Sequence, residues 1–272
     1  MSTLGTHPLL QRYQSGQREQ VWSAMIALGP AIRREPYWSD AQAVAGETMK
    51  RALHNVTHLI DRLQKLGFKF YAPAIAGIEW QGPVGPRIST RDFLRHMPPD
   101  SETPRELADI ERCFGVLPLS LRAWYEIVGG VEFRGDHSSL AGFLGPRPEV
   151  QGREIYPDPL VVFPPVYQFM SRGAEGASLR RGAIRRVPGD SPELLEISAD
   201  LVSKAGYGGG LPFQIQVPNV CADARLLRER HGRSFLDYIR VSFRWGGFPG
   251  WEAHEERPEK ELAYLRDGLL EI

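Results

Sequence analysis

The chain has 272 residues, of which 42% are hydrophobic, and this is enough apolar material to bury a substantial core in one large domain or two small ones. Lysine plus arginine and aspartate plus glutamate both number 33, so the formal net charge is zero and no global field favours nucleic acid or an anionic membrane as a partner. The two cysteines, Cys113 and Cys221, form neither a CxxC motif nor a dense disulfide framework, which suits a reducing compartment.

The first 20 residues lack a basic stretch followed by a long apolar one, and nowhere do 18 apolar residues follow one another. We therefore expect a cytoplasmic protein without a standard export signal and without a membrane as its partner.

Residues 1–98 are predicted to be mainly helical. Ser39 can cap a long amphipathic helix that ends at Gly67, and at ~1.5 Å per residue this helix approaches 40 Å. Its apolar positions follow steps of three and four residues: Met49, Ala52, Val56, Leu59, Leu63 and Leu66. A shorter partner helix is expected around Trp22, and FKFYAP after Gly67 alternates like a strand.

Residues 103–135 are predicted to form two helices that lead into a strand. Thr103 and Glu106 have the spacing of a capping box, and Gly115 ends the first helix. We expect helices over 104–115 and 118–129, joined by a turn of two or three residues. Trp124 lies centrally on the apolar stripe of the second helix, so its side chain should be buried against a sheet.

The rest of the chain alternates short strands with proline and glycine. The strand candidates are LVVFPP (160–165), LLEIS (194–198) and FQIQV (213–217), and antiparallel pairing is expected. Ser234 with Asp237 is predicted to cap a further helix, and Pro258 to open the last one. Helices followed by strands indicate an α+β fold.

The segment CFGVLPLSLRAWYEIVGGV, which follows an acidic helix, resembles the SMI1/KNR4 family, also called the SUKH superfamily. Members carry a helix ending in glycine, a Leu-Pro pair, and a second helix with an aromatic residue before a glycine pair. The matching positions are Glu111, Gly115, Leu117, Pro118, Trp124, Tyr125, Gly129 and Gly130.

This resemblance covers roughly residues 103–165. It implies a SUKH-like domain over 99–272, an antiparallel sheet flanked by helices, with residues 1–98 as an added helical region packed on its core. Many bacterial members are immunity proteins that neutralise toxins, and others are adaptors without chemistry of their own. The expected function is therefore protein binding, without enzymatic activity, cofactor or metal.

Two patterns offer chemical alternatives. His54 and His58 are spaced to share a metal ion, but the glutamate of an HExxH motif and a third histidine are missing, so solvated histidines are the preferred interpretation. The glycines from Gly206 to Gly210 could approach a phosphate, which would suit a hydrolase or nucleotide-binding enzyme. No Walker or Rossmann spacing accompanies them, so a flexible turn is preferred.

Two segments are candidate partner surfaces. The run FRWGGFPGWEAHEE (243–256) places four aromatic residues beside acidic ones, and its rings could form a plug over the sheet or anchors for a partner. We expect Trp251 to be the exposed ring, flanked by Glu252, Glu255 and Glu256, which would complement a basic toxin. The alternative surface is an arginine-rich segment with Arg180, Arg181, Arg185 and Arg186.

The sequence thus predicts an immunity protein that occludes a toxin in its own cytoplasm. An enzyme with a site near Gly206–Gly210 and a regulatory adaptor remain as alternatives. An enzyme should have a concave pocket with convergent polar groups, whereas a binding protein should have an exposed mixed patch.

Overall fold

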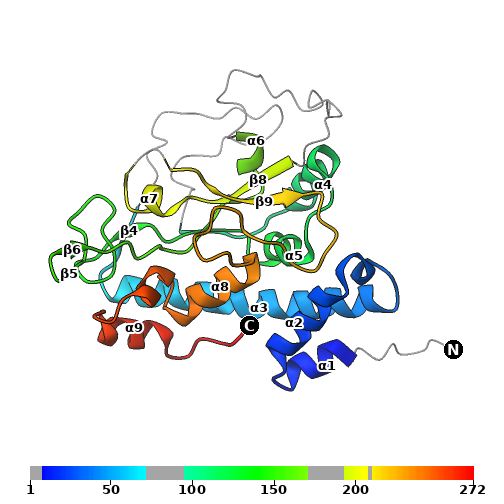
Figure 1. Ribbon diagram of the computed structural model, residues 1–272, viewed down its shortest axis with the longest axis horizontal. Coiled ribbons are helices and arrows are strands. Elements are labelled where there is room, and N and C mark those ends of the chain that lie inside the picture. The colour runs from blue at the N-terminus through cyan, green and yellow to red at the C-terminus, as the bar shows by residue number, and fades with distance from the viewer. Residues whose placement is uncertain (1–7, 72–94, 171–192, 208–209) are drawn as a thin grey trace.

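The computed structural model describes residues 8–71, 95–170, 193–207 and 210–272. It is a mixed α+β structure with a helical N-terminal region and several small antiparallel sheets (Figure 1). Within these residues, no helix is both long and apolar enough to cross a membrane.

The N-terminal region consists of α1 (Pro8–Gln14), α2 (Arg18–Ala27), the 3-10 helix η1 (Gly29–Arg33) and α3 (Tyr37–Lys65). The predicted apolar stripe of α3 is buried from Met49 to Leu63. The predicted capping role of Ser39 is wrong, because α3 already begins at Tyr37. The Ser39 hydroxyl instead donates to the Glu35 carboxylate at 2.5 Å. Asp40 holds α1 on α3, since its carboxylate accepts the amides of Leu9 and Leu10 at 2.7 and 3.1 Å.

The predicted helix pair is present as α4 (Thr103–Phe114) and α5 (Leu119–Ile127). The four residues 115–118 join them, so the expected shorter turn is wrong. Thr103 is the first helical residue, and the Asp100 carboxylate accepts its amide at 3.1 Å in place of the expected capping box. The chain between the helices stays extended because the first amides of α5, at Leu119 and Ser120, donate to carbonyls of Cys221 and Ala222.

Antiparallel pairing is confirmed, but the strands are short and divide into separate sheets. The three-stranded sheet has the order β2 (His96–Met97), β3 (Gly130–Glu132), β7 (Val161–Val162). The two-stranded sheets join β1 (Lys69–Phe70) to β4 (Gly135–Asp136), β5 (Glu149–Val150) to β6 (Arg153–Glu154), and β8 (Glu193–Ser198) to β9 (Phe213–Val217). Both β1 and β2 precede residue 98 and pair with strands that follow it, so the N-terminal region shares its sheets with the rest of the chain.

The remaining helices are α6 (Tyr167–Met170), α7 (Leu201–Lys204), α8 (Phe235–Arg244), the 3-10 helix η3 (Pro249–Ala253) and α9 (Glu259–Arg266). The predicted cap of α8 is confirmed, because the Ser234 hydroxyl accepts the Asp237 amide at 3.2 Å. Pro258 directly precedes α9, as expected.

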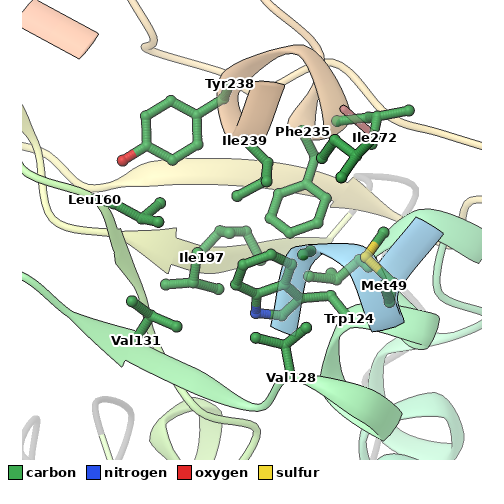
Figure 2. Close-up of a cluster of buried hydrophobic side chains, with 14 of the residues drawn as sticks. Met49, Trp124, Val128, Val131, Leu160, Ile197, Phe235, Tyr238, Ile239 and Ile272 are labelled. Carbon is green, nitrogen blue, oxygen red and sulfur yellow. The ribbon is translucent and has the colours of Figure 1, made fainter. Parts of the chain in front are cut away.

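One apolar core links nearly all of these elements. Figure 1 shows α3 running the length of the molecule, with β8 and β9 above it in this view and α1, α2 and α9 below. Trp124 is fully buried, as predicted, and Figure 2 shows its ring among Met49 of α3, Ile197 of β8 and Phe235 of α8. The Trp124 indole also donates to the Gly129 carbonyl at 2.7 Å.

The segment after α9 lies as an extended strap, residues 268–272, along α3. The buried Asn55 side chain donates to the Leu270 carbonyl at 2.8 Å and accepts its amide at 2.7 Å. Arg51 donates to the Glu271 carbonyl at 2.9 Å. One polar face of α3 therefore binds the strap through its backbone.

Candidate functional site

The predicted exposed ring of Trp251 is wrong, and its burial agrees with the plug interpretation. Trp251 is 2% exposed, and its indole donates to the Leu140 carbonyl at 3.2 Å. The cause is a close backbone approach at Gly250, whose amide donates to the Pro157 carbonyl. A Cβ at Gly250 would lie 2.1 Å from the Tyr156 carbonyl oxygen, so only glycine lets η3 press this ring inward.

The neighbouring acids do not form a free acidic patch. Glu252 makes ion pairs with Arg233 and, at 4.0 Å, with Arg244. Glu256 accepts a hydrogen bond from Gln151 at 3.1 Å and lines a shallow cleft of about 280 Å³ whose wall includes Trp251. Only Glu255 and Glu256 of the predicted set are well exposed.

The other predicted residues serve the fold or lie elsewhere. Leu117 and Trp124 are fully buried, Gly115 and Pro118 bound the extended connection, and Gly129 and Gly130 lie where α5 passes into β3. The arginines Arg180, Arg181, Arg185 and Arg186 lie outside the described residues.

His54 and His58 stack on one another with their ring centroids 5.7 Å apart. His58 Nε2 lies 3.1 Å from the Asp267 carbonyl oxygen, so this ring helps to hold the chain that follows α9. No group of three potential metal ligands occurs within the described ranges.

The glycine run packs around α7. The Gly206 backbone has φ +83°, and a Cβ there would lie 2.1 Å from the Phe143 carbonyl oxygen. Gly210 lies directly against the Asp200 carboxylate, which caps α7 by accepting the amides of Val202 and Ser203 at 2.8 and 3.2 Å. An anion would therefore meet a carboxylate at the end of this run, which disfavours a phosphate site there. Residues 208 and 209 are outside the described residues.

Beneath α7 lies a sealed polar cluster. The Lys204 ammonium is fully buried and donates to the Asp158 carboxylate and the Tyr238 hydroxyl, both at 2.7 Å. Burial, the largest single effect, opposes the charged form, but the Asp158 charge, Tyr238 and the hydrogen bonds to both outweigh it together, so the pKa of Lys204 lies above its usual value. A substrate cannot reach an ammonium with no exposed surface, so this group fastens α7 to α8.

Asp223 forms a second sealed cluster. Burial raises the pKa of its carboxyl, although hydrogen bonds to its oxygens act in the opposite direction. It accepts the Ser120 hydroxyl at 2.5 Å and the Leu236 amide at 3.3 Å. The carboxylate thereby joins the N-terminal turns of α5 and α8, where a negative charge also meets the positive ends of two helix dipoles.

Four exposed apolar side chains lie on α7 or on segments close to its two ends. Leu144 is 77% exposed, Leu211 62%, Val202 41% and Tyr207 39%. Val202 is on α7 and Tyr207 follows its end by three residues. The other two lie next to residues that contact its flanks: Leu144 follows Phe143, which contacts Gly206, and Leu211 follows Gly210, which contacts the cap residue Asp200. We refer to these four residues as the α7 patch.

Tyr207 of the α7 patch is held in place by polar neighbours. The Arg147 guanidinium lies 3.8 Å from the centre of the Tyr207 ring and donates to the Ala205 carbonyl at 2.8 Å. The Tyr207 hydroxyl donates to Glu154 at 2.9 Å, and this hydrogen bond raises the pKa of Tyr207. The ring is thus fixed although its face remains exposed.

The backbone of the loop that carries Leu144 is held by Asp136. A single oxygen of Asp136 accepts the amides of Phe143, Leu144 and Gly145 at 2.8, 3.0 and 2.8 Å. This arrangement orders the loop that presents Leu144 to solvent. The α7 patch was not predicted from the sequence, although the motif GFLGPRP places Phe143 and Leu144 between two glycines and before two prolines, which is typical of a loop.

No family model matches the chain, and no curated protein and no solved structure is significantly similar to it.

Proposed function

We propose that this protein acts by binding another protein, and that it is an immunity protein of the SUKH type which neutralises a cognate toxin in the cytoplasm by occlusion. The observation that carries the binding role is the α7 patch, four exposed apolar side chains on a preformed surface. The toxin as partner rests on the resemblance of residues 103–165 to SUKH proteins.

Side-chain entropy favours binding at the α7 patch in addition to its exposed apolar area. An interface gains most of its binding energy from a few anchors, in which tyrosine and arginine are enriched. Ordering one mobile side chain costs about 0.5–1.5 kcal/mol on association. Arg147 and Glu154 already hold Tyr207, and Asp136 already holds the Leu144 loop, so this cost is largely met during folding.

The enzyme alternative has less support from the described residues. The groups with the most unusual environments, Lys204 and Asp223, are buried and engaged with structural partners, whereas catalytic groups must reach a substrate. A regulatory adaptor would need only a binding surface, and the α7 patch could provide one.

The test is a pull-down with the product of the adjacent reading frame as bait. We expect the wild type to be retained, and Leu144→Asp and Tyr207→Ala each to weaken retention at least about tenfold, as expected for anchors worth 1.4 kcal/mol or more. Ile26→Asp is the matched control, because Ile26 is 44% exposed on α2 and outside the patch. Retention of both patch variants at wild-type affinity would exclude this surface, and no retention of the wild type would remove the immunity proposal.

A further inference from the structure

A second surface feature follows β9 in the chain. After β9 the chain forms a tight hairpin, residues 225–233, which contains four arginines in nine positions (RLLRERHGR). We call it the arginine hairpin. Its two arms pair through Leu226 and Arg233, and Leu227 pairs with Gln214 of β9 at 2.7 Å. The hairpin is therefore braced against a strand of the core.

The tip is held by a buried carboxylate. The Glu229 side chain is 2% exposed and accepts the amides of His231 and Arg233, both at 2.9 Å. Arg228 beside it has φ +67°, a left-handed conformation that is unfavourable for an arginine and persists only where its surroundings impose it. A solvated basic turn needs neither a buried carboxylate nor this backbone geometry.

The exposed charges of the hairpin are positive, one at its base and two near its tip. Arg225, Arg228 and Arg230 are exposed, and none of the described residues forms an ion pair with them. The two nearby acids are occupied: Glu229 points inward, and Glu252 pairs with Arg233. The pKa of His254 is lowered by burial and also by the positive charge of Arg230.

We propose that the arginine hairpin is a docking element for a protein surface rich in aspartate and glutamate. Guanidinium groups pair with carboxylates in a bidentate geometry, and arginine is favoured at interfaces for this reason. A nucleic acid is the less suitable partner. The hairpin sequence RLLRERHGR carries no phenylalanine, tyrosine or tryptophan on which a base could stack, and the chain as a whole lacks the net positive charge typical of nucleic-acid-binding domains. The proposal is independent of the α7 patch.

The first experiment measures fluorescence anisotropy with a labelled oligoglutamate peptide and, in parallel, a single-stranded oligonucleotide of matched charge. We expect the full-length protein to bind the peptide, with an affinity that falls between about 50 and 150 mM salt. The triple variant Arg225→Gln, Arg228→Gln and Arg230→Gln should lose about tenfold in affinity. Arg12→Gln, Arg34→Gln and Arg105→Gln remove the same charge from exposed sites elsewhere and should have no comparable effect.

Three outcomes would overturn the proposal: no salt-sensitive binding of the peptide, equal losses in the two triple variants, or tighter binding of the oligonucleotide than of the peptide.

The second experiment separates a preformed surface from simple positive charge. Glu229→Ala raises the net charge by one unit but removes the acceptor that orders the tip. We expect weaker peptide binding by this variant, with its fold verified by circular dichroism, because the arginines lose their common orientation. Stronger binding would mean that charge alone acts, and would overturn the role of the ordered hairpin.

Discussion

At the scale of single residues, Trp124 performs two tasks that a smaller side chain cannot combine. Its ring fills the space between α3, β8 and α8, with the Phe235 ring edge-on at 5.8 Å, and its indole nitrogen satisfies the carbonyl at the end of α5. Trp124 therefore supports both the core and the turn into β3.

We expect Trp124→Ala to lower the free energy of unfolding by about 3–5 kcal/mol, through lost transfer energy and the cavity left behind. Trp124→Phe should cost less, because most of the volume remains and only the indole hydrogen bond is lost. Urea denaturation of both variants measures this; similar midpoints for wild type and Trp124→Ala would contradict it.

The Lys204 cluster makes a distinct prediction. Lys204→Met leaves the Asp158 carboxylate buried without its counter-charge, which should cost about 3–5 kcal/mol. The double variant Lys204→Met, Asp158→Asn should recover part of this loss, since no uncompensated charge remains and asparagine tolerates the φ of +53° at position 158. A double variant less stable than the single one, by thermal melting, would contradict the charge argument.

Asp223 predicts a pH dependence. Because the carboxyl pKa is raised in the folded protein, the folded state binds this proton more tightly than the unfolded chain. The contribution of Asp223 to stability is therefore greatest below the ordinary pKa of about 4, and falls as the pH rises through the higher folded pKa. We expect the stability difference between wild type and Asp223→Asn to shift against the wild type as the pH rises above the ordinary carboxyl pKa of about 4. A difference that is constant with pH would refute the raised pKa.

At the scale of elements, the sequence predicted helices better than sheets. The stripe of α3 and the cap of α8 depend on residues close in sequence, so periodicity and Ser234 were sufficient to find them. The strands β1, β4 and β7 have two residues each and exist because they meet distant partners. Local propensity carries little information about such pairing.

The candidate site shows the same limit. Four aromatic residues in 243–256 signal a special structure, but whether Trp251 points outward depends on its approach to Tyr156 and Pro157, almost 100 positions earlier in the chain. The acids beside it could be recognised from sequence, whereas the pairing of Glu252 with Arg233 could not. The run RLLRERHGR was not predicted as a surface, because its composition alone resembles a solvated basic turn and only the structure shows the inward orientation of Glu229.

The strap along α3 gives the prediction that belongs to this scale. Asn55→Ala removes both hydrogen bonds to Leu270 from a buried site, so the strap should open locally while the core remains folded. Hydrogen exchange should become faster at residues 268–272 and stay unchanged in β8 and β9. Thr57→Ala on the exposed side of α3 is the control; uniform exchange changes across the protein would mean global destabilisation instead.

At the scale of the whole molecule, residues before and after position 98 share sheets and one core, and the described residues offer no cluster of metal ligands. We therefore expect EDTA to leave the melting temperature unchanged and elemental analysis to find no stoichiometric zinc, iron or manganese. A lower melting temperature with chelator, reversed by one of these metals, would contradict this.

The contact between the strap and α3 can form only late in synthesis. Asn55 and Leu270 are 215 positions apart, and at about 5–20 residues per second a ribosome needs on the order of 10–40 s to pass from one to the other. Throughout that time Asn55 on α3 lacks the Leu270 backbone groups that it binds in the finished fold. The polar contact between α3 and the strap therefore forms well after α3 can pack against α1 and α5.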